Sequence, residues 1–401
     1  MKICLISNLY HPFILGGAEI VVEKVANELL REGNEVIIIT TSPNKEFVEE
    51  MDGIKVFRIK PLNLYPMYSH QEKPGIIKPF WHLIDLWNLS SYVAVKDILK
   101  KEKPDIVHIH NFKGLSISVF SASKDLNIPV VFTAHDCSLI CPRANLLRAD
   151  NEACIEPKKV CGLYAKLNKK LLKDNVDWFI APSNFIINKL KSNVFFKDVK
   201  TTKIPLGVEI QNKKSEKTYD IIDISYMGNL SKSKGIHVLI NAFKNIKNKE
   251  IRLNLYGKGI DENEFKELAG DDARIIFHGF VDGKELINAY NQANITVLPS
   301  ICYDNSPMMV YESLMSGTPV IGSKIGGVPE LINEGENGFL FNPGNELELK
   351  NILEELIENP FKLKELEDMA FDSVKEFSME NHIKKLKEIY NSLILEKNKD
   401  I

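Results

Sequence analysis

The segment PSICYDNSPMMVYESLMSGTPVIGSKIGGVPELI, residues 299–332, contains a loop, a helical pattern and a returning strand within one short span. The helix is expected to begin near Pro307, because proline is favoured at the first helical position. Asp304 then lies in the loop and Glu312 one to two turns into the helix. Such a pair can bind a ribose and a second sugar, with free helix amides facing phosphates between them. A solvated acidic pair is the ordinary alternative.

Short apolar runs alternate with helical patterns on both sides of this segment, which is typical of βαβ units. The runs are rich in Val and Ile without alternation, so both faces of each sheet are expected to be covered by helices. We therefore predict an α/β protein with two doubly wound parallel sheets. The expected strands are residues 2–8, 34–41, 54–59, 105–111, 129–136, 178–183 and 202–208, then 220–228, 251–257, 274–279, 295–300, 318–323 and 338–341.

The length of 401 residues suits two domains, since one hydrophobic core stops growing at about 250–300 residues. The polar segment 209–220 lacks apolar periodicity and is the expected linker. We predict an N-terminal domain at 1–209, a C-terminal domain at 210–380 and a separate final helix at 381–401. The residues after the last strand have apolar positions at three- and four-residue steps, which indicates amphipathic packing helices.

Composition is that of an ordinary globular protein, with 44% hydrophobic and 26% charged residues. The N-terminal MKICLISNLYHPF lacks the basic and apolar regions of a secretion signal, and no long apolar run occurs, so a cytoplasmic location is expected. The net charge of −3 is uneven: the first half is positive and the second negative. Residues 158–203 hold eleven lysines against three aspartates, which suits an anionic partner or simply a solvated surface.

Two glycine-containing turns stand at strand-to-helix junctions. Gly16 and Gly17 follow the first strand, and Gly228 ends the first strand of the second half, shortly before Lys234. Glycine allows close backbone approach, and a helix N-terminus with a nearby lysine favours phosphate. Taken alone, the Gly16–Gly17 turn is as often an ordinary tight turn, and a lysine such as Lys234 is more often a surface residue. The dinucleotide fingerprint and the P-loop spacing are both absent, which argues against a dehydrogenase and a P-loop enzyme.

Taken together, GGAE, PDIVHIHN, TAHD, APSNFI, IPLGV, MGNLSKSKG, LYGKG, FHGFV, D-x7-E, SGTPVI, GGVPE and NGFLF resemble the family 4 retaining glycosyltransferases of GT-B fold. The resemblance spans nearly the whole chain, in order. It implies two Rossmann-like domains facing across a cleft, with the last helix crossing back to the first domain. It further implies a UDP-, GDP- or ADP-sugar donor on the C-terminal domain and a glycan or lipid-linked acceptor on the N-terminal one. No metal, cofactor or nucleic acid is expected.

The same resemblance implies roles for particular residues. Glu312 matches the residue that binds the ribose, Lys234 the one on the diphosphate and Asp304 the one on the transferred sugar. His135 matches the histidine between donor and acceptor. The full implied donor site is Gly16, Gly17, Gly228, Asn229, Lys234, Phe280, Val281, Asp304, Asn305, Ser306, Met308, Met309 and Glu312, with His135, Asp304 and Lys234 as catalytic residues.

Two positions depart from the family pattern. Asp304 stands where a glutamate is usual and is one methylene shorter. Asn229 replaces an arginine that normally helps to hold the diphosphate, so binding should depend more on Lys234 and on backbone amides. These departures leave open a catalytically silent subunit that supports a partner glycosyltransferase, and a GT-B epimerase or phosphorylase is a third alternative. The remaining motifs favour a hexose-transferring enzyme in cell-surface polysaccharide or glycoconjugate synthesis.

A basic amphipathic helix is expected within residues 162–177, with Leu163, Leu167 and Leu171 at four-residue steps. Such a helix can lie on an anionic membrane surface, as a peripheral protein would. The alternative is that it docks on the N-terminal sheet with its lysines in water. The apolar segment before residue 105 contains Trp81 and Trp87, which suit either an interface or the core.

Four of the six cysteines, Cys137, Cys141, Cys154 and Cys161, follow the TAHD motif. Their spacing lacks the paired C-x2-C of a strong zinc motif, although Cys137 and Cys141 would share a helical face. A structural metal site, reduced and partly buried thiols, and disulfides all remain open. Asp136 is expected to orient the turn, and catalysis by a thiol is not expected.

Overall fold

The computed structural model describes residues 1–14, 16–70, 72–148, 153–210 and 216–399. The chain forms two compact units. Unit 1 contains Met1–Ala144, Glu156–Gly207 and Met379–Ile401, and unit 2 contains Asn145–Ile155 and Val208–Ser378. The expected boundaries at 209 and 380 lie close to these changes. Residues 145–155, expected in the N-terminal domain, group with unit 2. Among the described residues of this segment, the Cys154 N–H donates to Leu146 O, and Leu147 forms an isolated bridge with Ala153.

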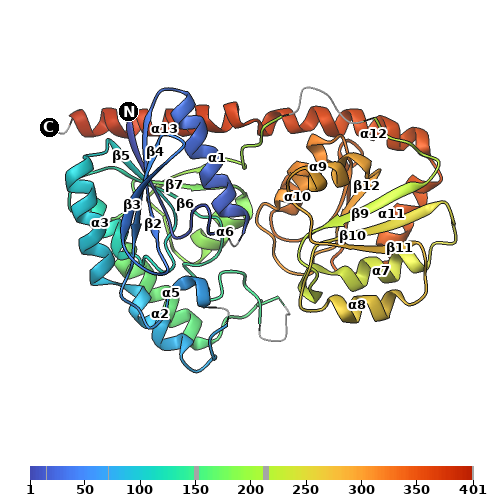
Figure 1. Ribbon diagram of the computed structural model, residues 1–401, viewed down its shortest axis with the longest axis horizontal. Helices are drawn as coiled ribbons and strands as arrows, with labels where there is room; N and C mark the ends of the chain where they lie inside the picture. Colours follow the sequence, from blue (N-terminus) through green and yellow to red (C-terminus); the bar gives the residue numbers. More distant parts are fainter. Residues whose placement is uncertain (15, 71, 149–152, 211–215, 400–401) are drawn as a thin grey trace. The chain divides into compact units, whose positions relative to one another are not determined.

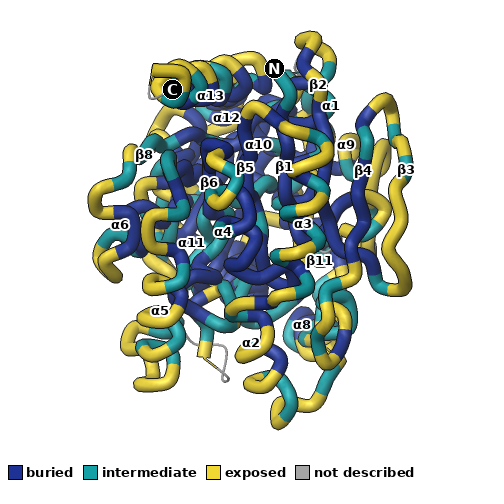
Figure 2. The backbone as a smooth tube through the Cα atoms, turned by 90° about the vertical axis from the view of Figure 1, so that its left-hand side faces the viewer, coloured by how far each residue is buried: buried dark blue, intermediate teal, exposed yellow. Residues whose placement is uncertain are grey.

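Unit 1 is built on an eight-stranded sheet in the order β3-β4-β2-β1-β5-β6-β7-β8 (Figure 1). Only β3 is antiparallel to its neighbour. Apolar runs form the centre: the side chains of Ile3 to Ile6 are fully buried, and Figure 2 shows this part of the sheet as buried. The strands are β1 (Lys2–Ser7), β2 (Glu35–Thr41), β3 (Phe47–Met51), β4 (Ile54–Ile59), β5 (Ile106–Asn111), β6 (Val130–Thr133), β7 (Trp178–Ala181) and β8 (Lys200–Lys203).

Helices cover the sheet of unit 1, and the final helix of the chain is one of them. That helix, α13, places Tyr390 against His108 of β5, with 2.6 Å between Tyr390 Oη and His108 Nδ1. Lys387 of α13 also pairs with Glu32 at 2.5 Å. The helices of unit 1 are α1 (Gly17–Arg31), α2 (Lys78–Leu86), α3 (Leu89–Glu102), α4 (Ser118–Lys124), α5 (Lys159–Leu172), α6 (Asn184–Ser192) and α13 (Met379–Lys399), with a 3-10 turn η1 (Met67–Ser69).

Unit 2 has a fully parallel six-stranded sheet in the order β11-β10-β9-β12-β13-β14. The strands are β9 (Ile222–Met227), β10 (Ile251–Tyr256), β11 (Ile275–Gly279), β12 (Ile295–Leu298), β13 (Val320–Ser323) and β14 (Gly338–Phe341). The helices are α7 (Ile236–Lys244), α8 (Glu262–Ala269), α9 (Gly283–Gln292), α10 (Met308–Met315), α11 (Glu346–Ile357) and α12 (Pro360–Ser373), with 3-10 turns η2 (Lys232–Lys234), η3 (Val328–Glu330) and η4 (Val374–Phe377). Two doubly wound α/β units are therefore confirmed.

One strand prediction in unit 1 was misplaced, and one strand was missed. The strand expected at 202–208 is β8, which begins at Lys200 and ends at Lys203. Pro205 explains the early end, because proline cannot donate to a sheet ladder. The edge strand β3 was not predicted, since its sequence FVEEM has no buried apolar run. Among the described residues, no helix combines the length and the apolar character needed to cross a bilayer.

Candidate functional site

The candidate site of unit 2 lies where the strand order of its sheet reverses. The chain proceeds from β9 to β10 on one side, whereas β12 pairs with the other side of β9. Ligands of open parallel sheets bind at such a switch point, outside the carboxyl ends of the strands. Gly228 and Asn229 follow β9 directly, η2 ends at Lys234, and Asp304 lies in the loop after β12. The topology thus brings these predicted residues to one edge.

An ion pair joins the two loops at this edge. Lys234 Nζ contacts Asp304 Oδ1, and Ser300 Oγ donates to Asp304 Oδ2 at 2.5 Å. The side chains of Lys234 and Asp304 are 28% and 14% exposed. Burial lowers the pKa of Lys234, but the Asp304 carboxylate more than offsets this, so the pKa is raised. The structure therefore holds a charged ammonium and a carboxylate together in a partly desolvated place.

Glycines allow these loops to approach closely. Gly235, at the C-cap of η2, has a φ of +71°, and a Cβ there would lie 1.9 Å from Pro299 O. Gly326 has a φ of +65°, and its Cβ would lie 2.1 Å from Asp304 O. The next residue, Gly327, donates its N–H to the same carbonyl at 2.7 Å. The IGGVPE motif therefore braces the Asp304 loop, a role that sequence reasoning missed.

Glu312 lies on α10, which begins at Met308, near the predicted start, with Pro307 as its N-cap. Tyr290 of α9 donates its hydroxyl to Glu312 Oε2 at 2.8 Å. Burial first, and then the adjacent Glu312 carboxylate, raise the pKa of Tyr290, so this tyrosine remains a donor. Sequence reasoning did not find Tyr290, because nothing in its own surroundings marks it. The hydrogen bond holds one carboxylate oxygen of Glu312 in place.

The other predicted donor residues near Glu312 lie just before α10 or in its first turn. Asn305, Ser306 and Met308 are partly exposed, whereas Met309 is buried. Ser306 Oγ lies 2.6 Å from Tyr311 Oη, so the turn before the helix is held from within the helix. The amides of this turn have no partners within the helix, as at every helix N-terminus.

Two further predicted groups lie along the same edge. Tyr226 Oη donates to Asn229 O at 2.9 Å, and a Cβ at Gly228 would lie 2.7 Å from that hydroxyl, which accounts for glycine there. Phe280 and Val281 follow β11, which lies two strands from β9 and so about 10 Å along the edge. Phe280 is exposed. This spacing suits the opposite end of an extended ligand from the Lys234–Asp304 pair.

In unit 1 the predicted residues Gly16, Gly17 and His135 also follow carboxyl ends of parallel strands. The strand order of this sheet reverses at β1, which pairs with β2 on one side and β5 on the other. Gly16 is the N-cap of α1 and donates its N–H to Glu19 Oε2 at 2.8 Å. His135 follows β6. Asp136 accepts the Ser138 N–H at 2.7 Å, so its expected role in the turn is confirmed.

His135 is one end of a histidine row that sequence reasoning missed. His110 Nδ1 lies 3.0 Å from His135 Nε2, and the rings of His110 and His108 are 4.0 Å apart. His108 Nε2 lies 2.7 Å from Thr133 Oγ1, while its Nδ1 meets Tyr390 of α13. Burial lowers the pKa of His135 to about 4 and those of His108 and His110 well below their ordinary values. The row is therefore neutral near pH 7. Its signal was the His-x-His in PDIVHIHN, which places both rings on one strand face.

Comparison with known proteins follows the same division of the chain. The family model described as Glycosyl transferases group 1 matches residues 208–372. The model of Glycosyltransferase Family 4 matches residues 15–212. The two models together match residues 15–372, and the chain belongs to the glycosyltransferase family that they describe. A protein from the cps region of Klebsiella pneumoniae is 28% identical to it over 344 residues, which are 82% of this chain and 87% of the relative.

Two solved structures show the fold of this glycosyltransferase. A sucrose-phosphate synthase from Thermosynechococcus elongatus matches with a TM-score of 0.76 and 20% identity, over 98% of this chain and 99% of the other. HepE of Anabaena, solved in complex with UDP-glucose, matches with a TM-score of 0.72 and 18% identity, over 98% of this chain and all of the other. The fold is GT-B.

Four of the six cysteines follow His135 closely in the sequence, and Cys302 lies two residues before Asp304. Cys137 and Cys141 are buried, and the Cys141 N–H donates to Cys137 O at 2.8 Å. Burial raises the pKa of the Cys137 thiol. All six cysteines belong to the described part of the chain, and no disulfide joins them. Within the described residues, no group of three or more His, Cys, Asp or Glu side chains is arranged to hold a metal ion.

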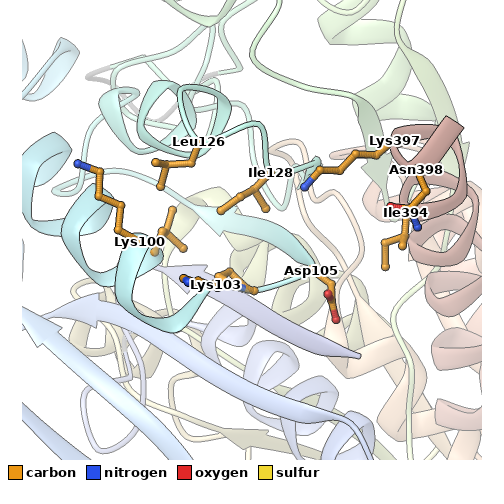
Figure 3. A pocket seen from close by; sticks show the side chains of 10 residues that line it. Lys100, Lys103, Asp105, Leu126, Ile128, Ile394, Lys397 and Asn398 are labelled. Atoms are coloured by element: carbon orange, nitrogen blue, oxygen red, sulfur yellow. The ribbon is translucent and has the colours of Figure 1, made fainter. Parts of the chain in front are cut away.

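One hollow of unit 1 is not part of the candidate site. It measures about 450 Å³ and is lined by Lys100, Asp105, Ile128 and Lys397 among others (Figure 3). Asp105 and Ile128 precede β5 and β6, so the hollow lies at the amino edge of the sheet. Gly16 and His135 follow the carboxyl ends, and none of the predicted site residues lines the hollow.

Proposed function

We propose that the protein transfers a hexose, with retention, from a nucleoside diphosphate sugar to a glycan or lipid-linked acceptor in cell-surface polysaccharide or glycoconjugate synthesis. The observation that carries the proposal is the Lys234–Asp304 pair at the switch point of unit 2, with Glu312 about one turn into α10. The cps-region relative and the UDP-glucose complex of HepE support the acceptor class and the donor class, respectively. The reaction would take place in the cytoplasm, at the inner face of the membrane.

Each charged group has a defined task in this reaction. Lys234 and the first amides of α10 would neutralise the departing diphosphate, and Glu312 would accept hydrogen bonds from the ribose hydroxyls. Asp304 would orient the hexose. Asn229 can donate a hydrogen bond but adds no charge, so Lys234 supplies the main positive charge, and a metal ion is not required.

The bond between the anomeric carbon and the diphosphate oxygen breaks, and the acceptor oxygen bonds to the same face of that carbon. The acceptor proton passes to the leaving phosphate oxygen. His135, kept neutral by burial and held by His110, would present a ring nitrogen to the transferred sugar. Gly16 and Gly17 would allow the backbone at the start of α1 to approach the diphosphate.

The test is a panel of UDP-, GDP- and ADP-sugars, with thermal stabilisation and slow donor hydrolysis as readouts and with EDTA present in a parallel series. One nucleotide should stabilise the protein, hydrolysis should persist in EDTA, and NMR should show the released sugar first in the donor's anomeric configuration. Glu312→Ala should lose the stabilisation, whereas the exposed Glu336→Ala on the same unit should keep it. If no nucleotide stabilises the wild-type protein and Glu312→Ala retains full function in cells, the silent-subunit alternative replaces this proposal.

A further inference from the structure

Helix α2 of unit 1 turns an apolar stripe outward. Phe80 and Leu83 are 61% and 64% exposed, and Ile84 and Trp87 are also exposed. Leu83 and Ile84 lie three and four residues after Phe80, so these three share one face of the helix, and Trp87 follows at its C-cap. The opposite face is anchored, because Trp81 is buried and donates its indole N–H to Tyr65 O at 2.8 Å. The exposed stripe is therefore a fixed feature of the fold.

Helix α5 also exposes apolar side chains to solvent. Val160 and Leu163 are 68% and 57% exposed, and Leu167 is exposed as well. The helix is docked through Asn168 and Leu172 instead, and Asn168 Nδ2 donates to Leu139 O at 2.9 Å. The expectation that this helix either docks or presents a membrane face was too narrow, because α5 docks by one face and leaves its leucine stripe in solvent.

The two helices adjoin. The rings of His82 on α2 and Tyr164 on α5 are 6.4 Å apart, and α2 and α5 lie at the same end of unit 1 (Figures 1 and 2). We call the exposed apolar residues and lysines of these helices the α2–α5 surface: Phe80, Leu83, Ile84, Trp87, Val160, Leu163 and Leu167, with Lys159, Lys166, Lys169 and Lys170.

The charged residues of the α2–α5 surface are all positive. Lys159, Lys166 and Lys170 are exposed and lie three or four residues from Leu163 or Leu167, so they border the leucine stripe. Helix α5 contains no acidic residue, and the single acid of α2, Asp85, is buried and accepts the Gly114 N–H at 2.9 Å. A partner that covers this surface must accept apolar side chains and several lysines together.

We infer that the α2–α5 surface docks on an anionic lipid bilayer, with both helices in the plane of the headgroups. Interfacial helices combine a leucine and aromatic face with lysines that meet acidic lipids, and Phe80 and Trp87 are side chains favoured at that depth. A protein partner fits less well, since the cores of protein interfaces are depleted in lysine. The inference goes beyond the proposed reaction, because a transferase with a soluble acceptor needs no such surface.

The experiment is cosedimentation of the full chain with vesicles of phosphatidylcholine alone or with added phosphatidylglycerol, at low and high salt. We expect binding to the anionic vesicles and much less to the neutral ones. Leu83→Ser with Leu163→Ser should lower the partition coefficient by about 10-fold for each leucine. Lys166→Ala with Lys170→Ala should lower it by about 5-fold for each charge at low salt and far less at high salt.

Matched controls lie on unit 2. Phe361→Ser and Lys364→Ala change exposed residues of α12 and should leave vesicle binding unchanged. Affinity for whichever nucleotide of the panel stabilises the wild-type protein, measured on every variant, should not change, so a failure of the proposed donor site is seen separately. The inference is overturned if the wild-type protein does not bind anionic vesicles at low salt, or if the controls lose as much binding as the α2–α5 variants. It is also overturned if the leucine variants abolish self-association in sedimentation velocity while vesicle binding is unchanged.

Discussion

Replacing Lys234 by alanine should lower both the stability of unit 2 and its affinity for a nucleotide. The mutation leaves the Asp304 carboxylate, which is only 14% exposed, with the Ser300 hydroxyl at 2.5 Å as its remaining side-chain donor. Exposed pairs contribute about 0.2–1 kcal/mol, and breaking a buried pair costs about 3–5 kcal/mol. At this partial burial we expect a loss of about 2 kcal/mol in the free energy of unfolding, or about 4–8 °C in Tm for a unit of this size.

Asp304→Ala should cost less, because the longer Lys234 side chain is 28% exposed and can turn its ammonium into water. The double variant should then be more stable than the sum of the two single losses predicts, by about 1–2 kcal/mol. Urea unfolding of the four proteins measures this coupling. Calorimetric titration with the stabilising nucleotide measures the second effect: Lys234→Ala should lose about 10- to 100-fold in affinity, whereas Asp304→Ala should mainly lose turnover. Additive stabilities, or an equal loss of affinity in both single variants, would refute this reasoning.

Three further outcomes follow from other contacts. Tyr290→Phe removes the 2.8 Å hydrogen bond to Glu312 and should weaken nucleotide binding by about 10-fold in calorimetry, so unchanged affinity would mean that Glu312 is held in place by other contacts. Burial lowers the pKa values of His135 and His382 to about 4. The unfolded chain therefore binds more protons below about pH 6.5, and stability should fall from there to about pH 4, by up to about 3 kcal/mol for each histidine. Urea unfolding across this pH range measures the fall in the free energy of unfolding. His135→Gln and His382→Gln should each make this fall less steep, and a fall as steep as in the wild-type protein in both variants would contradict the prediction. Cys141→Ser places a hydroxyl in a buried site and should cost about 1–3 kcal/mol in unfolding without changing nucleotide affinity, so a loss of affinity at full stability would be the contrary result.

The sequence pattern was sufficient to predict the strands whose side chains are completely buried. Residues 2–8 and 105–111 were predicted as strands from their apolar centres, Ile3 to Ile6 and Ile106 with Val107, and they form the neighbouring strands β1 and β5. Edge strands are different: β3 is held by pairing with β4 and has exposed side chains, so its own residues carry little signal. The orientation of α5 could not be predicted from the sequence either, because it depends on the hydrogen bond that Asn168 donates to the carbonyl of Leu139.

The candidate site shows the same limit. Asp304 was correctly placed in a loop and Glu312 on a helix. Both placements follow from local sequence, because Pro307 between them marks the start of the helix. The ion pair of Lys234 with Asp304 joins residues 70 positions apart, and it follows from the adjacency of β9 and β12. The contact of His110 with His135 likewise depends on strand neighbours. Family motifs named the members of the site, and only the sheet order shows which of them touch.

Helix α13 gives the synthesis of this chain a particular order. His108 lies at the centre of the first sheet, yet the hydroxyl that meets its Nδ1 belongs to Tyr390, 282 residues later. While the ribosome is still making unit 2, unit 1 lacks this helix, on which Leu386 and Leu393 are buried. Unit 1 is thus the first to be started and the last to be finished, and until α13 arrives the nascent chain presents an uncovered apolar face that chaperones would recognise.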